Sequence, residues 1–363
     1  MTLPYLKPSM AHGIVLVTGG TGYIGYQLCK QLAKEGYEVT TLSSKGQQSP
    51  AANHLRQSAR IIKADLSDLV SASSITPEIA KADYVIHLAG LNSATKSMGD
   101  PESYERVNID GTRNLISLIS QHGAPKKIIL ASSRAVYGEG AYRCPEGHVV
   151  YCEPRSPKHH IDRRFEPVCP QHGIDLNEFI PSKEGQPPKP VSIYGATKLK
   201  QEELVSGSGF PYQIFRLSNI YGHDTRIPGH SAGLVNLLTN RIIAGKEITV
   251  YESGGISRDF FHVGDAVKMI ISSLNNDPIQ SPILNLGSEQ RINLVDLAYD
   301  IGSHLGIRPH VNTPSKLMFG DVRNAASDTT LLHKHTNPSS LISLEEGIMD
   351  IIDTHLLAIQ KAA

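Results

Sequence analysis

Tyr194 and Lys198, in the stretch SIYGATK, are the residues of this sequence whose chemistry is easiest to name. If the stretch is helical, side chains four positions apart lie on one face and can meet. An ammonium beside a phenol favours the phenolate and lowers the phenol's pKa from its usual value of about 10. The pair would then transfer protons. A helix start with a surface tyrosine and a surface lysine is the alternative, and this stretch alone does not decide.

A glycine-rich stretch, VTGGTGYIG, follows a short apolar run at residues 14–17 and opens a helical pattern. Its glycines satisfy both GxGxxG and GxxGxxG spacings. Such glycines permit a tight turn, bring a pyrophosphate close to a helix N-terminus, and let the helix pack closely on the strand. The strand–turn–helix context predicts a nucleotide cofactor site. The residues expected to form it are Gly19, Gly22, Tyr23, Ile24 and Gly25.

The residue that would hold the cofactor's adenosine ribose is less usual. An Asp or Glu commonly follows the second strand and binds the ribose hydroxyls. Here that position is Ser43, followed by Ser44 and Lys45, which could face a 2′-phosphate instead. The sequence therefore leaves NAD and NADP open. Asp65, followed by Leu66 after the third strand, is placed either to meet the adenine edge or to form a turn.

Three of the four cysteines lie in one long stretch between Ser133 and Tyr194. A structureless loop of this length would be unusual, so we expect something to organise it. Cys144 with His148, and Cys169 with His172, form two Cys/His pairs about 20 residues apart, a pattern typical of a structural zinc site. Cys152 is an alternative ligand. Reduced thiols and solvent-facing histidines without a metal are the other interpretation.

Short apolar strands alternate with helical segments along the first half of the chain, which predicts an α/β fold with a doubly wound parallel sheet. A proline-rich segment, EGQPPKPV, precedes SIYGATK, and a smaller C-terminal domain is expected beyond it. The strands are expected at residues 14–17, 37–42, 59–65, 82–90, 125–133, 212–218 and 281–287.

Composition excludes several classes of protein. Lys+Arg and Asp+Glu both number 35, so there is no basic excess for a general nucleic-acid surface. No stretch is long and apolar enough to span a bilayer, and the N-terminus lacks the apolar core of a secretion signal, so we expect a cytoplasmic protein without a membrane partner. Four cysteines among 363 residues do not indicate a disulfide scaffold.

Several motifs in order make the chain resemble the extended short-chain dehydrogenase/reductase family. Within that family it is most similar to the nucleotide-sugar 4-epimerases, the group that includes UDP-glucose and dTDP-L-rhamnose 4-epimerases. The motifs are VTGGTGYIG, HLAGLNSATKSMGDPESYERVNIDGT, ASSRAVYG, YGATK, FRLSNIYG, SRDFFHVGDAV and FGDVRNAASDT. The resemblance implies a Rossmann-type NAD(P)-binding domain at residues 12–200, with an insertion at about 139–190. Residues 201–363 would mainly bind a dTDP- or UDP-hexose, with some segments returning to the sheet.

The resemblance also implies roles for individual residues. Tyr194 is similar to the family's catalytic acid/base, Lys198 to its partner that also holds the nicotinamide ribose, and Ser133 to the hydroxyl that binds the reacting sugar oxygen, with Ser132 as a neighbour it could be confused with. The further expected cofactor-binding residues are Leu88, Ala89, Gly90 and Asn108. The expected substrate-binding residues are Asn219, Arg258 and Arg323, the arginines because their forked donors suit a diphosphate.

Two departures from the family narrow the function. The 4,6-dehydratases carry Asp-Glu where this chain has Arg134 and Ala135, so dehydration is excluded, and Ser43 replaces the usual ribose carboxylate. An NAD-dependent 4-epimerase is the leading hypothesis, with an NADP-dependent 4-keto-sugar reductase as the alternative. A non-catalytic, regulatory NAD(P)-binding protein is a third hypothesis, since fold alone does not fix function. The resemblance also implies a homodimer formed through residues 101–122 and 192–206.

Overall fold

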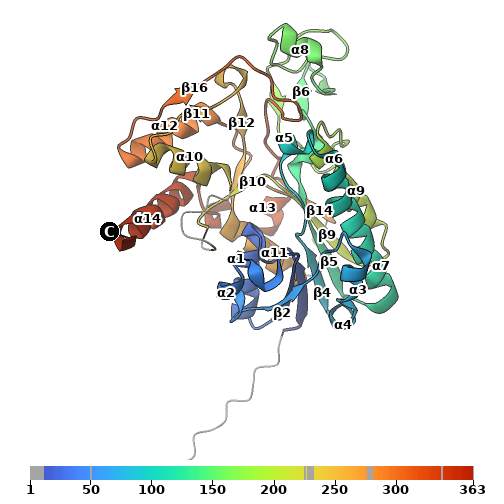
Figure 1. Ribbon diagram of the computed structural model, residues 1–363. Helices are drawn as coiled ribbons and strands as arrows, with labels where there is room; N and C mark the ends of the chain where they lie inside the picture. Colours follow the sequence, from blue (N-terminus) through green and yellow to red (C-terminus); the bar gives the residue numbers. More distant parts are fainter. Residues whose placement is uncertain are drawn as a thin grey trace, which may run out of the picture.

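A central sheet with helices on both sides carries the fold, and a second lobe lies beside it (Figure 1). The computed structural model describes residues 12–49, 51–224, 226, 233–275, 281–336 and 338–362. Parts of the stretch expected to form the second domain, at residues 201–363, therefore lie outside the described residues.

The sheet has seven parallel strands in the order β14-β9-β5-β4-β1-β2-β3. They are β1 (Ile14–Thr18), β2 (Glu38–Ser43), β3 (Arg60–Lys63), β4 (Tyr84–His87), β5 (Lys127–Ser133), β9 (Tyr212–Leu217) and β14 (Ile283–Leu286). The chain proceeds from β1 toward β3 and then returns to place β4 on the other side of β1. This reversal makes a crevice at the carboxyl ends of the strands, where ligands bind in such sheets. The doubly wound parallel sheet expected from the sequence is confirmed.

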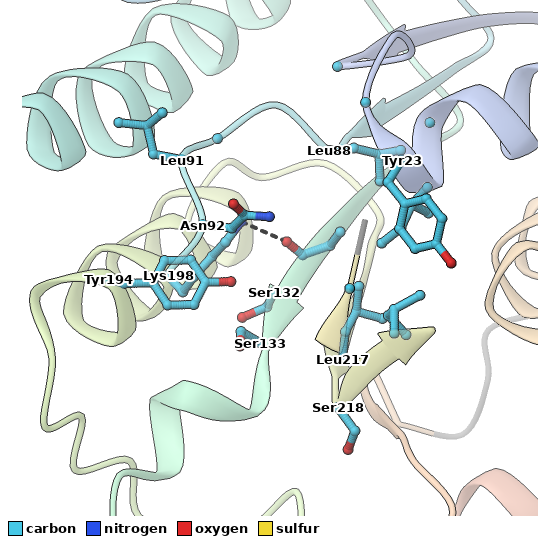
Figure 2. Close-up of a pocket in the computed structure, with 18 of the residues that line it drawn as sticks. Tyr23, Leu88, Leu91, Asn92, Ser132, Ser133, Tyr194, Lys198, Leu217 and Ser218 are labelled. Carbon is cyan, nitrogen blue, oxygen red and sulfur yellow. Dashed lines mark hydrogen bonds between the residues drawn. The ribbon is translucent and has the colours of Figure 1, made fainter. Parts of the chain in front are cut away.

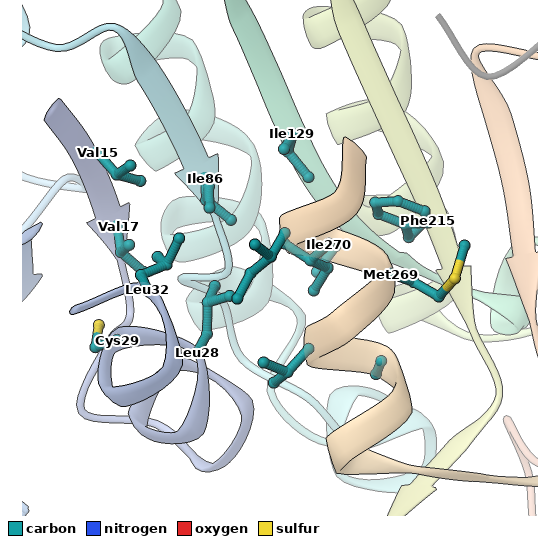
Figure 3. Packing of buried hydrophobic residues seen from close by; sticks show 14 of the residues in the cluster. Val15, Val17, Leu28, Cys29, Leu32, Ile86, Ile129, Phe215, Met269 and Ile270 are labelled. Atoms are coloured by element: carbon teal, nitrogen blue, oxygen red, sulfur yellow. The ribbon is translucent and has the colours of Figure 1, made fainter. Parts of the chain in front are cut away.

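The apolar strands bury both of their faces, which explains why they lack the alternation of a half-exposed sheet. Val15 and Val17 of β1 point to one core, whereas Leu16 points to the other. On the first side, α1 (Tyr23–Lys34) and α11 (Val263–Asn275) cover the sheet, and Figure 3 shows their side chains packed together against the strands. On the second side, α7 (Gly111–His122) and α9 (Ile193–Ser206) cover it.

Short helices make most of the remaining connections between the strands. Gly36 follows α1 with a φ of +87°, the left-handed conformation that commonly ends a helix. The connecting helices are α2 (Ala52–Leu55), α3 (Leu69–Ser73), α4 (Thr76–Ile79), α5 (Ala94–Ser97), α6 (Pro101–Tyr104), the π-helix η2 (Glu105–Asp110) and the 3-10 helices η1 (Gly46–Gln48) and η3 (Arg134–Tyr137). In the long connections after β4 and β5, these helices position the loops that line the cavities described below.

The second lobe has its own apolar core, to which α10, α12 and α14 contribute. Two small parallel pairs, β10 with β13 and β11 with β16, and one antiparallel pair, β12 with β15, complete it. Its elements are β10 (Asn219–Tyr221), α10 (Leu234–Ile243), β11 (Ile248–Thr249), η4 (Glu252–Gly254), β12 (Ser257–Arg258), β13 (Phe260–His262), β15 (Ile292–Asn293), α12 (Leu294–Leu305), β16 (Val311–Asn312), η5 (Pro338–Ser340) and α14 (Leu344–Ala362). The short helix α13 (Leu332–His335) packs on the central sheet instead, where Leu332 joins its first core.

The insertion folds as a small unit above α5 in Figure 1, as its length led us to expect. It contains a three-stranded antiparallel sheet of β6 (Ala141–Arg143), β7 (Val149–Tyr151) and β8 (Phe179–Ile180), with α8 (Pro157–Ile161) beside it. Arg155 ties this unit to the second lobe, because its guanidinium lies 2.7 Å from Glu139 and 2.7 Å from Glu252. All three side chains are at most 2% exposed, so the charges are fully enclosed and compensate one another.

None of the helices in the described part of the chain combines the length and apolarity that crossing a membrane requires.

Gly138, at the start of the insertion, packs against the backbone of Lys189 at its end. This close packing offers a test of the fold. Its φ is +62° and a Cβ there would lie 1.9 Å from the carbonyl oxygen of Lys189. Lys189 also donates its N–H to Val136 at 3.0 Å, so the backbone cannot move aside without losing this bond. Gly138→Ala is expected to lower the free energy of unfolding by about 3 kcal/mol or more, measured by urea denaturation.

Gly147→Ala is the matched control. Its φ is +85°, but a Cβ there would meet nothing within 4 Å. It should therefore cost only about 1 kcal/mol, from the left-handed backbone alone. Equal costs at the two positions would contradict this account of how the insertion is anchored.

Candidate active site

The loop between β1 and α1 forms a cradle that only glycine can build. A Cβ on Gly25 would lie 2.3 Å from the carbonyl oxygen of Gly19, and a Cβ on Gly19 would lie 2.9 Å from the backbone nitrogen of Ala89. Gly22 precedes α1 as its N-cap, with no side chain that caps the helix and no acidic residue in the first turn. The N–H groups at this helix end therefore remain available, together with the positive end of the helix dipole, for a phosphate.

Two cavities lie along this cradle. The larger, of about 680 Å³, extends from the glycine loop to Ser133, Tyr194 and Lys198. The smaller, of about 340 Å³, lies over the ends of β2 and β3. Both share Gly19, Gly22, Leu88 and Gly90 in their walls. Of the remaining predicted cofactor residues, Tyr23, Ile24 and Gly25 line the larger cavity, and Ser43, Asp65, Leu66 and Ala89 line the smaller one. The two cavities together suit an elongated molecule with a phosphate-rich middle.

Tyr194 and Lys198 both lie in α9, which begins after Ser192. Ser192 caps the helix by accepting a hydrogen bond from the N–H of Gly195 at 3.0 Å. Lys198 is only 5% exposed, and its Nζ donates to the carbonyl oxygen of Ala131 at 3.0 Å. Figure 2 shows the Tyr194 ring, Lys198 and Ser133 gathered at the same end of the cavity. The alternative of a surface tyrosine and a surface lysine is therefore wrong.

Three consecutive residues of β5 each contact a different residue of α9. The carbonyl of Ala131 accepts from Lys198, the Ser132 hydroxyl donates to Glu202, and the Ser133 hydroxyl is hydrogen-bonded to Tyr194. Ser132 faces into the protein at 2% exposure, whereas Ser133 is the serine that meets the tyrosine. This geometry separates the two serines that the sequence could not.

The electrostatics of the pair differ from the sequence-based expectation. Burial raises the pKa of Tyr194 above its usual value, and the hydrogen bond with Ser133 only partly opposes this rise. Burial also lowers the pKa of Lys198 to about 8, while the charge of Glu202 works in the other direction. The prediction that the pKa of Tyr194 lies below its usual value is therefore wrong for the chain by itself, because burial dominates the shift and the charge of Lys198 is not among its causes.

Asn108 lies in the π-helix η2 and is completely buried. Its Oδ1 accepts from the N–H of Leu91 at 2.7 Å, and its Nδ2 donates to the Thr197 hydroxyl at 2.9 Å. It therefore joins α9 to the loop after β4, whose residues Gly90 and Leu91 line both cavities. Asn108 itself is not among the described residues that line either one.

Two of the predicted substrate residues, Arg258 and Arg323, line neither of the two cavities. Arg258 is 7% exposed and its Nη2 lies 2.5 Å from Asp321. Arg323 is held by Glu166 of the insertion, 2.7 Å from its Nη2. Both guanidinium groups already hold a carboxylate, so a diphosphate would compete with it. Asn219 lies in β10, between two residues that do line the larger cavity.

The predicted zinc site is not formed. Cys144, Cys152 and Cys169 are at most 3% exposed and make a small core with apolar residues of the insertion, as small hydrophobic side chains do. The His172 ring does lie 3.2 Å from the Cys169 sulfur, but its other nitrogen meets Glu146 at 3.1 Å.

The second histidine, His148, is 68% exposed, and its Nε2 lies 3.8 Å from Glu146. All five expected ligands are among the described residues. Across that part of the chain, no group of three or more His, Cys, Asp or Glu side chains is placed to hold a metal ion. The structure therefore does not support zinc as the element that organises the insertion; the apolar core and the Arg155 ion pairs do so instead.

Sequence reasoning also missed residues at this site. Lys96, Asn92 and Arg226 line the larger cavity, and Arg226 is paired with Asp224 at 2.7 Å. Glu202 was missed as well, although it lies four positions after Lys198. The same i, i+4 spacing that singled out Tyr194 and Lys198 could have identified it.

The comparisons with known proteins all identify the same family. Residues 15–287 match the NAD dependent epimerase/dehydratase family. The chain is 31% identical over 350 residues to dTDP-L-rhamnose 4-epimerase of Burkholderia thailandensis, with 93% of each chain covered. It is 27% identical over 348 residues to UDP-N-acetyl-alpha-D-glucosaminuronate decarboxylase of Bacillus cytotoxicus, with 93% of this chain and 96% of the relative covered.

A solved structure shows a similar fold. UDP-glucose 4-epimerase of Thermotoga maritima superposes with a TM-score of 0.73 at 24% identity, covering 95% of this chain and 99% of that one.

Glu202 offers a test of how α9 is held against the strands β5 and β9. It is 4% exposed and pairs with Arg216 of β9 through several hydrogen bonds, the shortest at 2.7 Å. Glu202→Ala would leave the buried guanidinium without its partner. We expect it to lower the free energy of unfolding by about 3–5 kcal/mol, measured by urea denaturation.

Glu203→Ala is the control, one position further along the same helix. Glu203 pairs with Lys200 at the surface, where the two side chains are 55% and 49% exposed. Its loss should change the stability by less than about 1 kcal/mol. A small effect at both positions would show that the buried pair of Glu202 and Arg216 does not hold α9 against β9.

Proposed function

Because the chain belongs to the NAD dependent epimerase/dehydratase family, we propose that it is an NAD-dependent epimerase that inverts C4 of a hexose linked to a nucleoside diphosphate. The observation that carries the proposal is the convergence of Ser133, Tyr194 and Lys198 at one end of a cavity whose other end is the glycine cradle. A cavity of about 680 Å³ is within the usual range for small-molecule sites, about 300–1,000 Å³.

The glycine cradle fits NAD. Gly19, Gly22 and Gly25 leave room where a Cβ would collide with backbone, and the uncapped N-terminus of α1 would hold the pyrophosphate. Lys198 would hold the nicotinamide ribose, and Ser43 and Asp65 would meet the adenosine end. When bound, NAD supplies the acceptor that takes a hydride from the sugar and later returns it.

Tyr194 is the residue that we assign to proton transfer. Its phenol oxygen would take the proton of the sugar's C4 hydroxyl during oxidation and return it during reduction. Ser133, hydrogen-bonded to Tyr194, would orient the same sugar oxygen. The positive charge of an oxidised nicotinamide would favour the phenolate, which opposes the rise in the pKa of Tyr194 caused by burial.

Lys198 would add to this charge when protonated. Its pKa of about 8 lies close to neutrality, so the ammonium predominates below about pH 8. Its bond to the Ala131 carbonyl fixes the ammonium beside the sheet. Lys198 therefore acts both as a ligand for the cofactor and as a local positive charge.

A 4-keto-sugar reductase that uses NADP is the second candidate, and one observation favours it. Ser43 and Ser44 line the smaller cavity at the position where an acidic residue would bind an NAD ribose. A reductase would consume one NADPH for each product, whereas an epimerase needs no net reductant. Incubating the chain with a nucleotide-4-keto-hexose and NADPH tests the reductase, which would oxidise one NADPH for each alcohol formed. An epimerase would instead convert a nucleotide-hexose to its C4 epimer without any loss of NADPH.

Substrate and assembly complete the proposal. A dTDP- or UDP-hexose is the substrate class supported by the relatives' activities. Asn219, Arg258 and Arg323 are proposed to hold its nucleotide diphosphate. The homodimer through residues 101–122 and 192–206 remains a prediction, which the molecular mass in solution tests.

Tyr194→Phe tests the proton-transfer role. Removing the phenol oxygen should lower turnover of dTDP-L-rhamnose or UDP-glucose by about 10² or more, the usual scale for a lost acid or base. NAD binding should survive, because the ring and the glycine cradle remain. Turnover is followed by NMR of the sugar, and NAD is measured after denaturation.

Tyr299→Phe serves as its control, since Tyr299 lies in α12 and is 44% exposed. It should turn over at the rate of the unchanged chain. A Tyr194→Phe variant with full activity would contradict the assignment.

A further inference from the structure

Arg226 follows β10 of the second lobe, yet it lies at the glycine loop beside the sheet. It lines the larger cavity together with Gly22 and Tyr23. Its Nη1 lies 3.4 Å from the carbonyl oxygen of Thr21, and its guanidinium carbon lies 5.7 Å from the centre of the Tyr23 ring. Thr21 and Tyr23 flank Gly22, the N-cap of α1. The guanidinium is therefore placed at the end of α1 that the cradle leaves open to a phosphate.

The segment that precedes Arg226 is docked on α1 by hydrogen bonds from two side chains of the helix. The Tyr23 hydroxyl donates to the carbonyl oxygen of Gly222 at 2.8 Å, and Nε2 of Gln27 donates to the carbonyl oxygen of His223 at 3.1 Å. Tyr23 and Gln27 are four positions apart, so both bonds leave the same face of α1. The fold thus sets the position of this segment against the glycine loop, and little order has to be imposed when a ligand binds.

Asp224 holds only one edge of the Arg226 guanidinium. Nε and Nη2 of the arginine donate to the two carboxylate oxygens at 2.8 and 2.7 Å. A guanidinium carries its N–H donors in one plane, so Nη1 and the second N–H of Nη2 point along another edge. The contact of Nη1 with the Thr21 carbonyl, at 3.4 Å, is long for a hydrogen bond. A phosphate at the end of α1 would receive shorter and stronger hydrogen bonds from this edge.

The charge at this end of α1 suits a diphosphate. The first turn of the helix has no acidic residue, and the helix dipole adds roughly half a positive charge there. The Arg226 side chain is only 12% exposed, so water weakens its attraction to an anion less than at an open surface. Figure 2 shows Tyr23 on the opposite side of the larger cavity from Tyr194. A diphosphate held here would therefore lie away from the phenol that transfers the proton.

We propose that Arg226 binds the diphosphate of NAD and slows the release of the cofactor. NAD is then held by both lobes, with the glycine cradle on one side and Arg226 on the other. The inference rests on the proposed function, because an epimerase uses one bound NAD for both half-reactions, whereas a reductase must exchange its cofactor after each product. The diphosphate is that of the cofactor rather than of the sugar nucleotide, since Thr21 and Tyr23 belong to the cradle.

The rate at which NAD leaves the full chain tests this role. The chain is loaded with radiolabelled NAD, and loss of the label is followed after excess unlabelled NAD is added. Arg226→Gln should release NAD about 10- to 100-fold faster, the loss expected for hydrogen bonds between a guanidinium and a phosphate. This variant leaves Asp224, which is 1% exposed, without its partner. The double variant Asp224→Asn with Arg226→Gln removes both charges and should release NAD at the same increased rate.

Asp224→Asn alone separates a direct contact from a structural one. This variant keeps the guanidinium and removes the carboxylate that shares it, so NAD should leave no faster than from the unchanged chain. If Arg226 only anchored its segment through Asp224, then Asp224→Asn would release NAD as fast as the double variant does. That result overturns the inference, and so does release at the unchanged rate from the double variant.

The double variant Asp175→Asn with Arg164→Gln is the matched control. It also removes an Arg–Asp pair, but this pair lies in the insertion, its side chains are 41% and 40% exposed, and it lines neither of the two cavities. The control should release NAD at the rate of the unchanged chain. Equally fast release from the control and from the variant at Arg226 would contradict a specific contact.

Binding of UDP in saturating NAD identifies which diphosphate Arg226 contacts. The affinity for UDP, measured by calorimetry, should be the same for the unchanged chain and for the double variant at Asp224 and Arg226. If that variant loses affinity for UDP but keeps NAD as long as the unchanged chain, the arginine serves the substrate and the inference fails. None of these measurements needs turnover. If the variant releases NAD faster while the unchanged chain shows no epimerisation, the proposed function fails and the contact of Arg226 with NAD is supported.

Discussion

The contact between the end of β5 and one face of α9 is the constraint on which the candidate site depends. Residues 131, 132 and 133 are consecutive in a strand, and they contact residues 198, 202 and 194, which follow one another at four-residue intervals along a helix. A strand and a helix can match in this way only at one register. The buried pair of Glu202 and Arg216 extends the match to β9, so three elements of the fold fix the position of one phenol oxygen.

Buried ion pairs join the insertion to the second lobe. Arg155, Glu139 and Glu252 join the insertion to the second lobe without contact with water, and Arg323 with Glu166 joins them again. Buried charges tolerate little displacement, because each leaves its partner uncompensated. The insertion is therefore held firmly against the second lobe. This explains how a segment with no regular pattern in the sequence can still take one fixed position in the molecule.

Local patterns in the sequence predicted the features that depend on neighbours along the chain. The strand before Gly19, the cradle and the helix spacing of Tyr194 and Lys198 all belong to this class. The partners of Arg258 and Arg323 could not be predicted, since Asp321 and Glu166 reach them only through the fold. The predicted direction of the shift in the pKa of Tyr194 was wrong for the same reason. Spacing shows which charge is near, but only the structure shows how far both groups are removed from water. The spacing of the cysteines suggested a metal site, whereas in the structure these side chains pack as small apolar groups in the core of the insertion.

The central claim is that the hydride removed from C4 returns to C4 of the same sugar. The most direct test is turnover of a nucleotide-hexose in deuterated water, with NAD but no added reductant, followed by NMR of the product. Because a hydride held on the cofactor does not exchange with solvent, the epimerised product should carry hydrogen at C4 and no deuterium there. Deuterium at C4, or a reaction that stops without added NADPH, would contradict the account.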